Sequence, residues 1–219
     1  MSTPTTEISA PRGLVPLNLH ELWEYRELAF FMLFRDIKGR YRQMALGPLW
    51  MIINPIMNVI VFTIVFGQMA KFPSDGVPYP LFNYSALLPW GFFSGSLFTA
   101  AGSLLGYKDL ISKVYFPRLV IPLIGVLSAL VDFLISFVLL LGLAGYYGYW
   151  PTWHMLFIPM FLLMAAVIGL AVGLWFASWI VHFRDVSAIL GYFVRAWMYV
   201  TPVVYASSFV PERWRGLYR

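Results

Sequence analysis

The sequence contains no cysteine, and this absence excludes several kinds of chemistry. A chain without cysteine has no disulfide, no thiol nucleophile and no cysteine-ligated metal site. Its three histidines, His20, His154 and His182, are not spaced as pairs on one helical face, so the sequence has no zinc motif. We therefore predict no metal site and assign no catalytic residue.

A glycine-rich phosphate-binding loop of the Walker type is also missing from the 219 residues. We therefore predict that the chain hydrolyses no nucleotide, binds no cofactor and is not an enzyme. The start of the sequence does not match a cleavable signal, because residues 1–16 are polar, rich in proline and threonine, and lack an apolar core. Residues 1–17 are predicted to be a disordered cytoplasmic segment.

Charged residues are scarce, at 11% of the chain against 60% hydrophobic residues. A soluble domain carries about 25% charged residues, so this chain has too little polar surface to face water on all sides. We predict an all-α integral membrane protein in which residues 18–219 form a single transmembrane domain. The net charge of +5 does not indicate nucleic-acid binding, because most basic residues lie just outside apolar runs.

Five apolar runs are long enough to cross a bilayer, which takes about 20 helical residues. They cover about residues 46–69, 84–105, 119–146, 154–181 and 186–205. One side of these runs carries most of the basic residues, namely Arg35, Lys38, Arg40, Arg42, Lys108, Lys113, Arg118 and Arg184. By the positive-inside rule that side is cytoplasmic, which places the N-terminus inside and the C-terminus outside.

Residues 18–43, ahead of the first run, are predicted to form an amphipathic helix that lies in the membrane interface. Asn18 can cap its start with Glu21 at the third position, in a variant of the capping box. The segment is too charged to span a bilayer, and its basic end suits anionic lipid. The residues that we assign to this interface helix are Trp23, Arg26, Phe30, Phe34, Arg35, Lys38 and Arg40.

Two ionisable residues stand out inside the apolar runs: Asp132 in the third and Arg195 in the fifth. A single charge at the centre of a membrane helix costs about 3 kcal/mol on insertion scales. We predict that the two residues form an ion pair across these helices, and a role on a substrate path is the alternative.

Aromatic residues continue well into the fifth run, at Tyr192, Phe193, Trp197 and Tyr199. Aromatic faces stack on the C–H faces of sugar rings, which would suit a sliding polymer. The same residues could equally anchor the helix in lipid or pack against neighbouring helices.

The loop of residues 106–118 joins the second run to the third and has two interpretations. Lys108 to Tyr115 can form two helical turns, and Pro117 would end that helix near its preceding residue. The loop could be an ordinary cytoplasmic connection whose basic residues set the orientation of the chain. It could also be a rigid contact element for a soluble partner.

Three ordered stretches together resemble the permease subunit of type-2 ABC exporters for bacterial polysaccharides such as O-antigen, capsule and teichoic acid. The first is Arg35-Asp36-Ile37-Lys38-x-Arg40-Tyr41, continuing to Leu46-Gly47-x-Leu49-Trp50 with Pro55. The second is Leu110-Ile111-x-Lys113-Val114-Tyr115-Phe116-Pro117-Arg118 with Pro122. The third is Phe183-Arg184-Asp185-Val186, continuing to Pro202-Val203-Val204-Tyr205 and Val210-Pro211-Glu212-x-Trp214-Arg215.

This resemblance implies a homodimeric permease in the bacterial inner membrane, with two cytoplasmic ATPase subunits that bind ATP and magnesium. It implies a lipid-linked polysaccharide as the substrate, carried through a channel between the two protomers. The first and fifth spans would line most of that channel, and the candidates in this sequence are Trp50, Asn54, Asn58, Tyr192, Phe193, Trp197 and Tyr199.

The resemblance also assigns the two segments outside the spans. Residues 18–34 would form the helix beside the gate. The loop would be the coupling helix seated in a groove of the ATPase, with Tyr107, Lys108, Asp109, Leu110, Ile111, Ser112, Lys113, Val114, Tyr115, Phe116, Pro117 and Arg118. Residues 206–219 would begin a re-entrant periplasmic segment, and a sixth span of the family would follow the last residue, Arg219.

Two other functions remain open. The first is a permease of the same ABC class for drugs or small lipids, distinguished by a closed apolar seam in place of a wide aromatic channel. The second is a membrane-embedded enzyme or assembly factor. It would need a convergent polar cluster at one membrane face, for which only Asp132, Arg195 and residues 182–185 are available.

Overall fold

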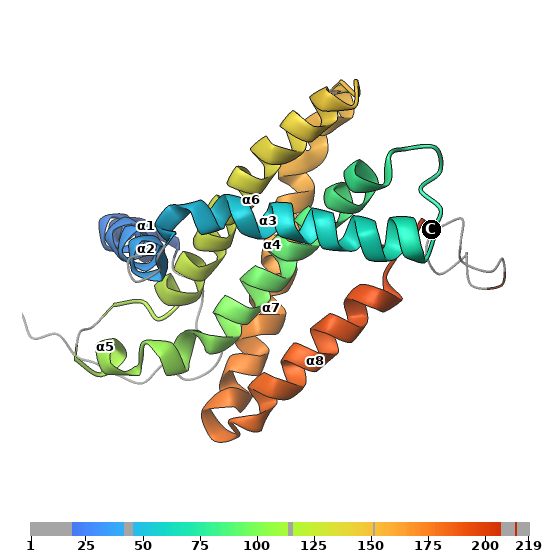
Figure 1. Cartoon of the computed structure of the whole chain (residues 1–219). Helices are drawn as coiled ribbons and strands as arrows, with labels where there is room; N and C mark the ends of the chain where they lie inside the picture. Colours follow the sequence, from blue (N-terminus) through green and yellow to red (C-terminus); the bar gives the residue numbers. More distant parts are fainter. Residues whose placement is uncertain (1–18, 42–45, 114–115, 151, 207–212, 214–219) are drawn as a thin grey trace, which may run out of the picture.

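In the computed structural model the chain is described over residues 19–41, 46–113, 116–150, 152–206 and 213, and the elements there are helices. This confirms the predicted all-α class. Figure 1 shows the helices, whose bounds are α1 Leu19–Glu24, α2 Arg26–Tyr41, η1 Gly47–Leu49, α3 Trp50–Phe62, η2 Thr63–Met69, α4 Tyr79–Gly106, α5 Lys108–Lys113, α6 Val120–Tyr146, η3 Trp153–Phe157, α7 Ile158–His182 and α8 Asp185–Val200.

Helix α4 is the centre of the fold, because it packs along both α6 and α7. Small residues make this close packing possible, as in many membrane proteins. A Cβ atom added to Gly173 of α7 would lie 2.6 Å from the Ala100 Cβ atom and 2.6 Å from the Leu97 carbonyl oxygen. On the other side of α4, a Cβ atom on Gly125 of α6 would lie 2.7 Å from the Thr99 side chain.

Three helical segments are long and apolar enough to cross a membrane by length and composition: Gly47–Met69, Val120–Tyr146 and Trp153–His182. They coincide with the first, third and fourth predicted spans, and they confirm a membrane-embedded chain. Helix α4 is long, at 28 residues, but its apolar sequence is interrupted by residues such as Asn83 and Ser96. These two side chains are fully buried against protein. Helix α8 has 16 residues, and the number of spans stays a prediction.

The fifth predicted span is wrong at its end, because α8 stops at Val200 and not near residue 205. The next residue, Thr201, has extended backbone angles of φ −80° and ψ 145°. Pro202 explains this conformation, since a proline ring clashes with a helical residue before it.

The predicted single helix over residues 18–43 is also corrected. The structure divides it into α1 and α2, separated by a turn at Tyr25. The proposed cap Asn18 and residues 42–43 lie outside the described residues, as do residues 1–17. Of the expected re-entrant segment, only Ala206 and Arg213 are described.

Successive long helices run in opposite directions, so the connections gather at two ends (Figure 1). Helix α2 lies at the left of the figure, α5 lies at the lower left, and the turn between α7 and α8 lies at the bottom. The connections between η2 and α4 and between α6 and α7 lie at the upper right. The basic segments that sequence analysis assigned to one side of the membrane therefore do share one end of the molecule.

We predict that Gly173→Ala destabilises the protein by about 1–3 kcal/mol, because the added methyl group forces α4 and α7 apart. The matched control is Gly142→Ala on α6, where an added Cβ atom has nothing within 4 Å. Gly142→Ala should leave the free energy of unfolding unchanged or raise it, because alanine is more favourable than glycine within a helix by up to about 1 kcal/mol. Thermal unfolding in detergent measures both, and an equal response of the two variants would contradict the packing argument.

Candidate functional site

A cavity of about 680 Å³ opens between α3, α4, α6 and α8. Its lining residues recur at helical spacing on each of these elements, as in Gly191, Val194, Arg195, Met198 and Tyr199 of α8. Residues at i, i+3, i+4 and i+7 share one helix face, so each helix presents one continuous face to the cavity.

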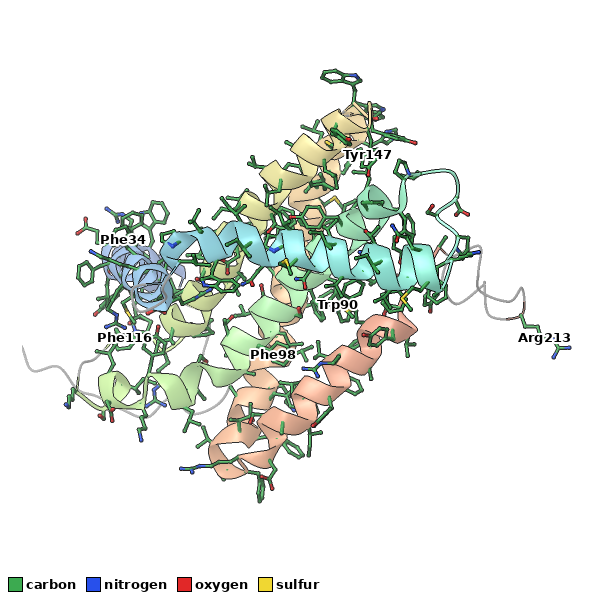
Figure 2. All side chains as sticks on the ribbon, in the orientation of Figure 1. Phe34, Trp90, Phe98, Phe116, Tyr147 and Arg213 are labelled. Carbon is green, nitrogen blue, oxygen red and sulfur yellow. The ribbon has the colours of Figure 1, made fainter. Side chains whose placement is uncertain are left out.

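The lining combines aromatic and polar side chains. The aromatic residues are Trp50, Phe62, Tyr84, Trp90, Phe92, Phe98, Phe133 and Tyr199. The polar residues are Asn54, Asn58, Ser94, Asp132, Ser136 and Arg195. Figure 2 shows Trp90 and Phe98 on the part of α4 that faces α8. Such a surface suits a ligand that has both apolar faces and many hydroxyl groups.

The structure places four of the seven channel candidates on this cavity: Trp50, Asn54, Asn58 and Tyr199. Tyr192, Phe193 and Trp197 are not part of its lining. Trp197 instead packs in edge contact with Trp90 and Phe93 of α4, at centroid distances of 6.5 Å and 6.3 Å. Its role in this structure is therefore to join α8 to α4.

The predicted pair of Asp132 with Arg195 is corrected by the structure. The Arg40 guanidinium donates from Nη1 to Asp132 Oδ2 at 2.9 Å, and from Nη2 to the Ser128 hydroxyl. Asp132 and Arg195 both line the cavity, but they form no ion pair within the described residues. The reason is that α2 packs against α6, which brings a cation assigned to the membrane interface onto the carboxylate.

Sequence reasoning missed this role of Arg40 because the contact joins residues 92 positions apart. One signal was available. Ser128 and Asp132 lie four residues apart on one face of α6, and together they offer two acceptors to a single guanidinium.

The predicted amphipathic helix in the loop of residues 106–118 is confirmed as α5, Lys108–Lys113. Its polar residues Lys108, Asp109, Ser112 and Lys113 are exposed. Its apolar residues Leu110 and Ile111 pack against a buried cluster. That cluster consists of Met32 of α2, Phe116 and three residues in the first turns of α6, Val120, Ile121 and Ile124. Val114 and Tyr115 lie outside the described residues, Phe116 is buried, Pro117 is half-buried and Arg118 is exposed.

Tyr107 joins the corner between α4 and α5 to α2. Its hydroxyl donates a hydrogen bond to Asp36 Oδ2, and the Arg35 guanidinium lies 5.9 Å from its ring centroid. Burial, with a further contribution from the Asp36 carboxylate, raises the pKa of Tyr107 from 10.0 to about 12. The hydroxyl therefore stays protonated, and able to donate, well above neutral pH.

The interface-helix residues present large aromatic side chains outward. Trp23, Phe30 and Phe34 are 67%, 71% and 59% exposed. Arg26 lies over the Trp23 ring at 5.3 Å and donates to the Trp23 carbonyl at 3.1 Å. Arg35 and Lys38 are also exposed. Exposed aromatics beside cations are typical of a helix that lies at a membrane surface.

These features define the class of protein: a helical, membrane-embedded chain with an open cavity lined by polar and aromatic residues. The chain belongs to the ABC-2 type transporter family, whose model matches residues 27–219. It is a permease subunit of that family.

Two relatives in the same family are named as exporters. The chain is 34% identical to the O-antigen export system permease protein RfbA of Myxococcus xanthus, over 89% of this chain and 74% of the relative. It is 28% identical to the O-antigen export system permease protein RfbA of Klebsiella pneumoniae, over 82% of this chain and 69% of the relative. The resemblance drawn from the three sequence stretches is therefore confirmed at the level of the family.

We predict the outcome of a difference titration, in which the ultraviolet absorbance of the Tyr107→Phe variant is subtracted from that of the native chain at each pH. The difference should show one tyrosinate that forms near pH 12. A raised pKa means that the fold favours the protonated hydroxyl. The stability that Tyr107 contributes is therefore complete below pH 10 and is lost as the pH rises toward 12. Asp36→Asn should lower this pKa while leaving it above 10, because burial is the larger cause. In this difference titration, a Tyr107 tyrosinate that forms near pH 10 would contradict the contact.

Proposed function

We propose that this chain is the membrane-spanning subunit of an ATP-driven exporter that moves lipid-linked polysaccharide, similar to O-antigen, across the bacterial inner membrane. Two copies would form the channel, and two cytoplasmic ATPase subunits would bind ATP and magnesium. The names of the relatives in Myxococcus xanthus and Klebsiella pneumoniae support the polysaccharide cargo.

The cavity between α3, α4, α6 and α8 is the observation that carries this proposal. Its aromatic faces can stack on sugar rings without selecting one linkage, and its amide groups can exchange hydrogen bonds with successive hydroxyls. A second protomer facing α3 and α8 would close the open side into a channel. In this arrangement Tyr192 and Phe193, which are 73% and 56% exposed, belong to the wall shared by the two copies.

The position of α5 fits the coupling role. Its polar face is exposed, while its apolar face rests on α2 and α6. In the proposed orientation this end is cytoplasmic, so Lys108 and Lys113 of α5 are available to contact the ATPase. A displacement of α5 would then move α2 and α6, against which it packs. The exposed aromatics of α1 and α2 would lie in the lipid surface beside the gate, where lipid-linked substrate enters.

An exporter of drugs or small lipids is the second candidate. Such an exporter would have a closed apolar seam in place of a wide channel. The cavity here instead carries amide, carboxylate and guanidinium groups. The amide groups and the Arg195 guanidinium would find no hydrogen-bond partner on an apolar cargo, which is unfavourable inside a membrane. The lining therefore favours a hydroxyl-rich substrate.

We predict that Lys108→Glu with Lys113→Glu weakens association with the ATPase subunit by about tenfold or more, since interface energy concentrates in a few residues. Co-purification in detergent measures the association. The matched control is Lys71→Glu, a charge reversal in the connection between η2 and α4, and that connection lies at the opposite end of the molecule from α5 (Figure 1). Pro117→Ala should weaken coupling as well, because Pro117 fixes the backbone of the connection that leads from α5 into α6. Unchanged association and export in both variants would refute the coupling role of this loop.

We predict that Trp50→Ala lowers polysaccharide export several-fold and leaves ATPase association intact, because it removes an aromatic face from the cavity. The control is Trp179→Ala on α7, an exposed tryptophan that does not line the cavity. Surface polysaccharide, measured by immunoblot in cells that lack the native permease, compares the two. Equal export by both variants would exclude the cavity as the path of the polymer.

A further inference from the structure

Two residues in the same part of α2, Asp36 and Arg40, make polar contacts with different parts of the protein. Asp36 accepts a hydrogen bond from Tyr107, at the corner that leads into α5. Arg40 pairs with Asp132 at 2.9 Å, and Asp132 forms part of the cavity wall. The contact surface for the ATPase and the cavity wall are therefore both joined by hydrogen bonds to one segment of α2.

Asp36 and Arg40 lie four residues apart, which places them on one face of α2, one turn from each other. An acid four residues before a base is the favourable order for an ion pair within a helix. In this structure each residue has another partner: Tyr107 and Arg35 for Asp36, and Asp132 and Ser128 for Arg40. Arg40 thus has two possible carboxylate partners, one on its own helix and one on the cavity wall.

Apolar packing supports the same connection. Met32 of α2 is buried, at 2% exposed, in a cluster with Phe116, Val120 and Ile124. Tyr107 and the apolar residues of α5 pack against this cluster. Displacement of α5 therefore presses on α2 over a close-packed surface, and such surfaces transmit strain.

We propose that Tyr107, Asp36, Arg40 and Asp132 form a relay that carries movement of α5 to the wall of the cavity. These four are positioning residues: they do not hydrolyse ATP, and they set where α2 holds α6. When α5 moves, the hydrogen bond from Tyr107 to Asp36 breaks or shortens. The Arg40 guanidinium then divides its ion pairing differently between the Asp36 and Asp132 carboxylates. Because Asp132 lines the cavity, that redistribution changes both the charge and the shape of the wall. This inference rests on the proposed function for its transport readout.

The test compares Tyr107→Phe, Asp36→Asn and Arg40→Gln in the full permease with its ATPase, reconstituted in proteoliposomes. We expect export per ATP hydrolysed to fall by about two- to thirtyfold, the range that 0.5–2 kcal/mol of lost coupling gives. Association with the ATPase and hydrolysis should persist, because the exposed face of α5 is unchanged. The control is Tyr147→Phe, which directly follows α6 at the opposite end of the molecule from α5 (Figure 2). Native export per ATP in all three variants would overturn the relay.

An exchange of charges separates the relay from simple loss of folding. Arg40→Asp and Asp132→Arg should each lower the stability of the contact between α2 and α6, and the double exchange should regain that stability because the two charges can pair again. The double variant should still be uncoupled, because an aspartate at position 40 cannot pair with Asp36. If the pair between positions 40 and 132 had only a structural role, the double variant would regain native export per ATP together with its stability. That outcome would also overturn the proposal.

A spin-label distance measurement on the permease alone tests the relay independently of the proposed function. The chain has no native cysteine, so Gly39→Cys and Gly106→Cys can be spin-labelled without background. Both positions leave open space for a side chain. We expect a narrow distance distribution between α2 and the end of α4, broadened by Tyr107→Phe or Asp36→Asn. Unchanged widths would overturn the relay, whereas native permease that exports no polysaccharide with its ATPase would instead refute the proposed function.

Discussion

The close contact of α4 with α7 determines where every other helix can lie. At Gly173 the two helices approach so closely that an added Cβ atom would clash with α4, at Gly169 the approach is also tight, and Ala100 is fully buried there. A bilayer supplies no hydrophobic force between helices, so association depends on this kind of contact. With α7 against one face of α4 and α6 along another, the remaining face is left to α3 and α8. The cavity forms on that remaining face, because neither α3 nor α8 packs on α4 as tightly as α6 and α7 do.

The parts of the fold that depend on local pattern could be predicted from the sequence. Apolar run length predicted the three segments that are long and apolar enough to cross a membrane, and a short helix starting at Lys108 was predicted in the loop that Pro117 bounds. The end of α8 was missed even though the signal was local, since Pro202 disfavours helix at the residue before it. Boundaries depend on single residues of this kind, whereas the existence of a helix depends on many residues together.

The site was less predictable, because its contacts join distant parts of the chain. The sequence identified Asp132 as a charge that needs a partner, but counting charges inside apolar runs left Arg195 as the only choice. The actual partner, Arg40, belongs to a segment too polar to span the bilayer. No periodicity within one helix shows that α2 packs against α6. The same limit explains why Trp197, assigned to the channel, instead packs on α4.

Pairing Asp132 with Arg40 has a consequence that a pair with Arg195 would not have. A carboxylate within a membrane helix is costly, so Asp132 holds Arg40, and with it α2, at the protein surface beside α6. Arg195 is then left on the cavity lining, and its charge can be met by water or by a polar cargo. A pair between Asp132 and Arg195 would have fixed α6 to α8 across the cavity and opposed any widening. The observed pair leaves α8 free of this constraint and makes the position of α6 depend on α2, the helix that also contacts the corner leading into α5.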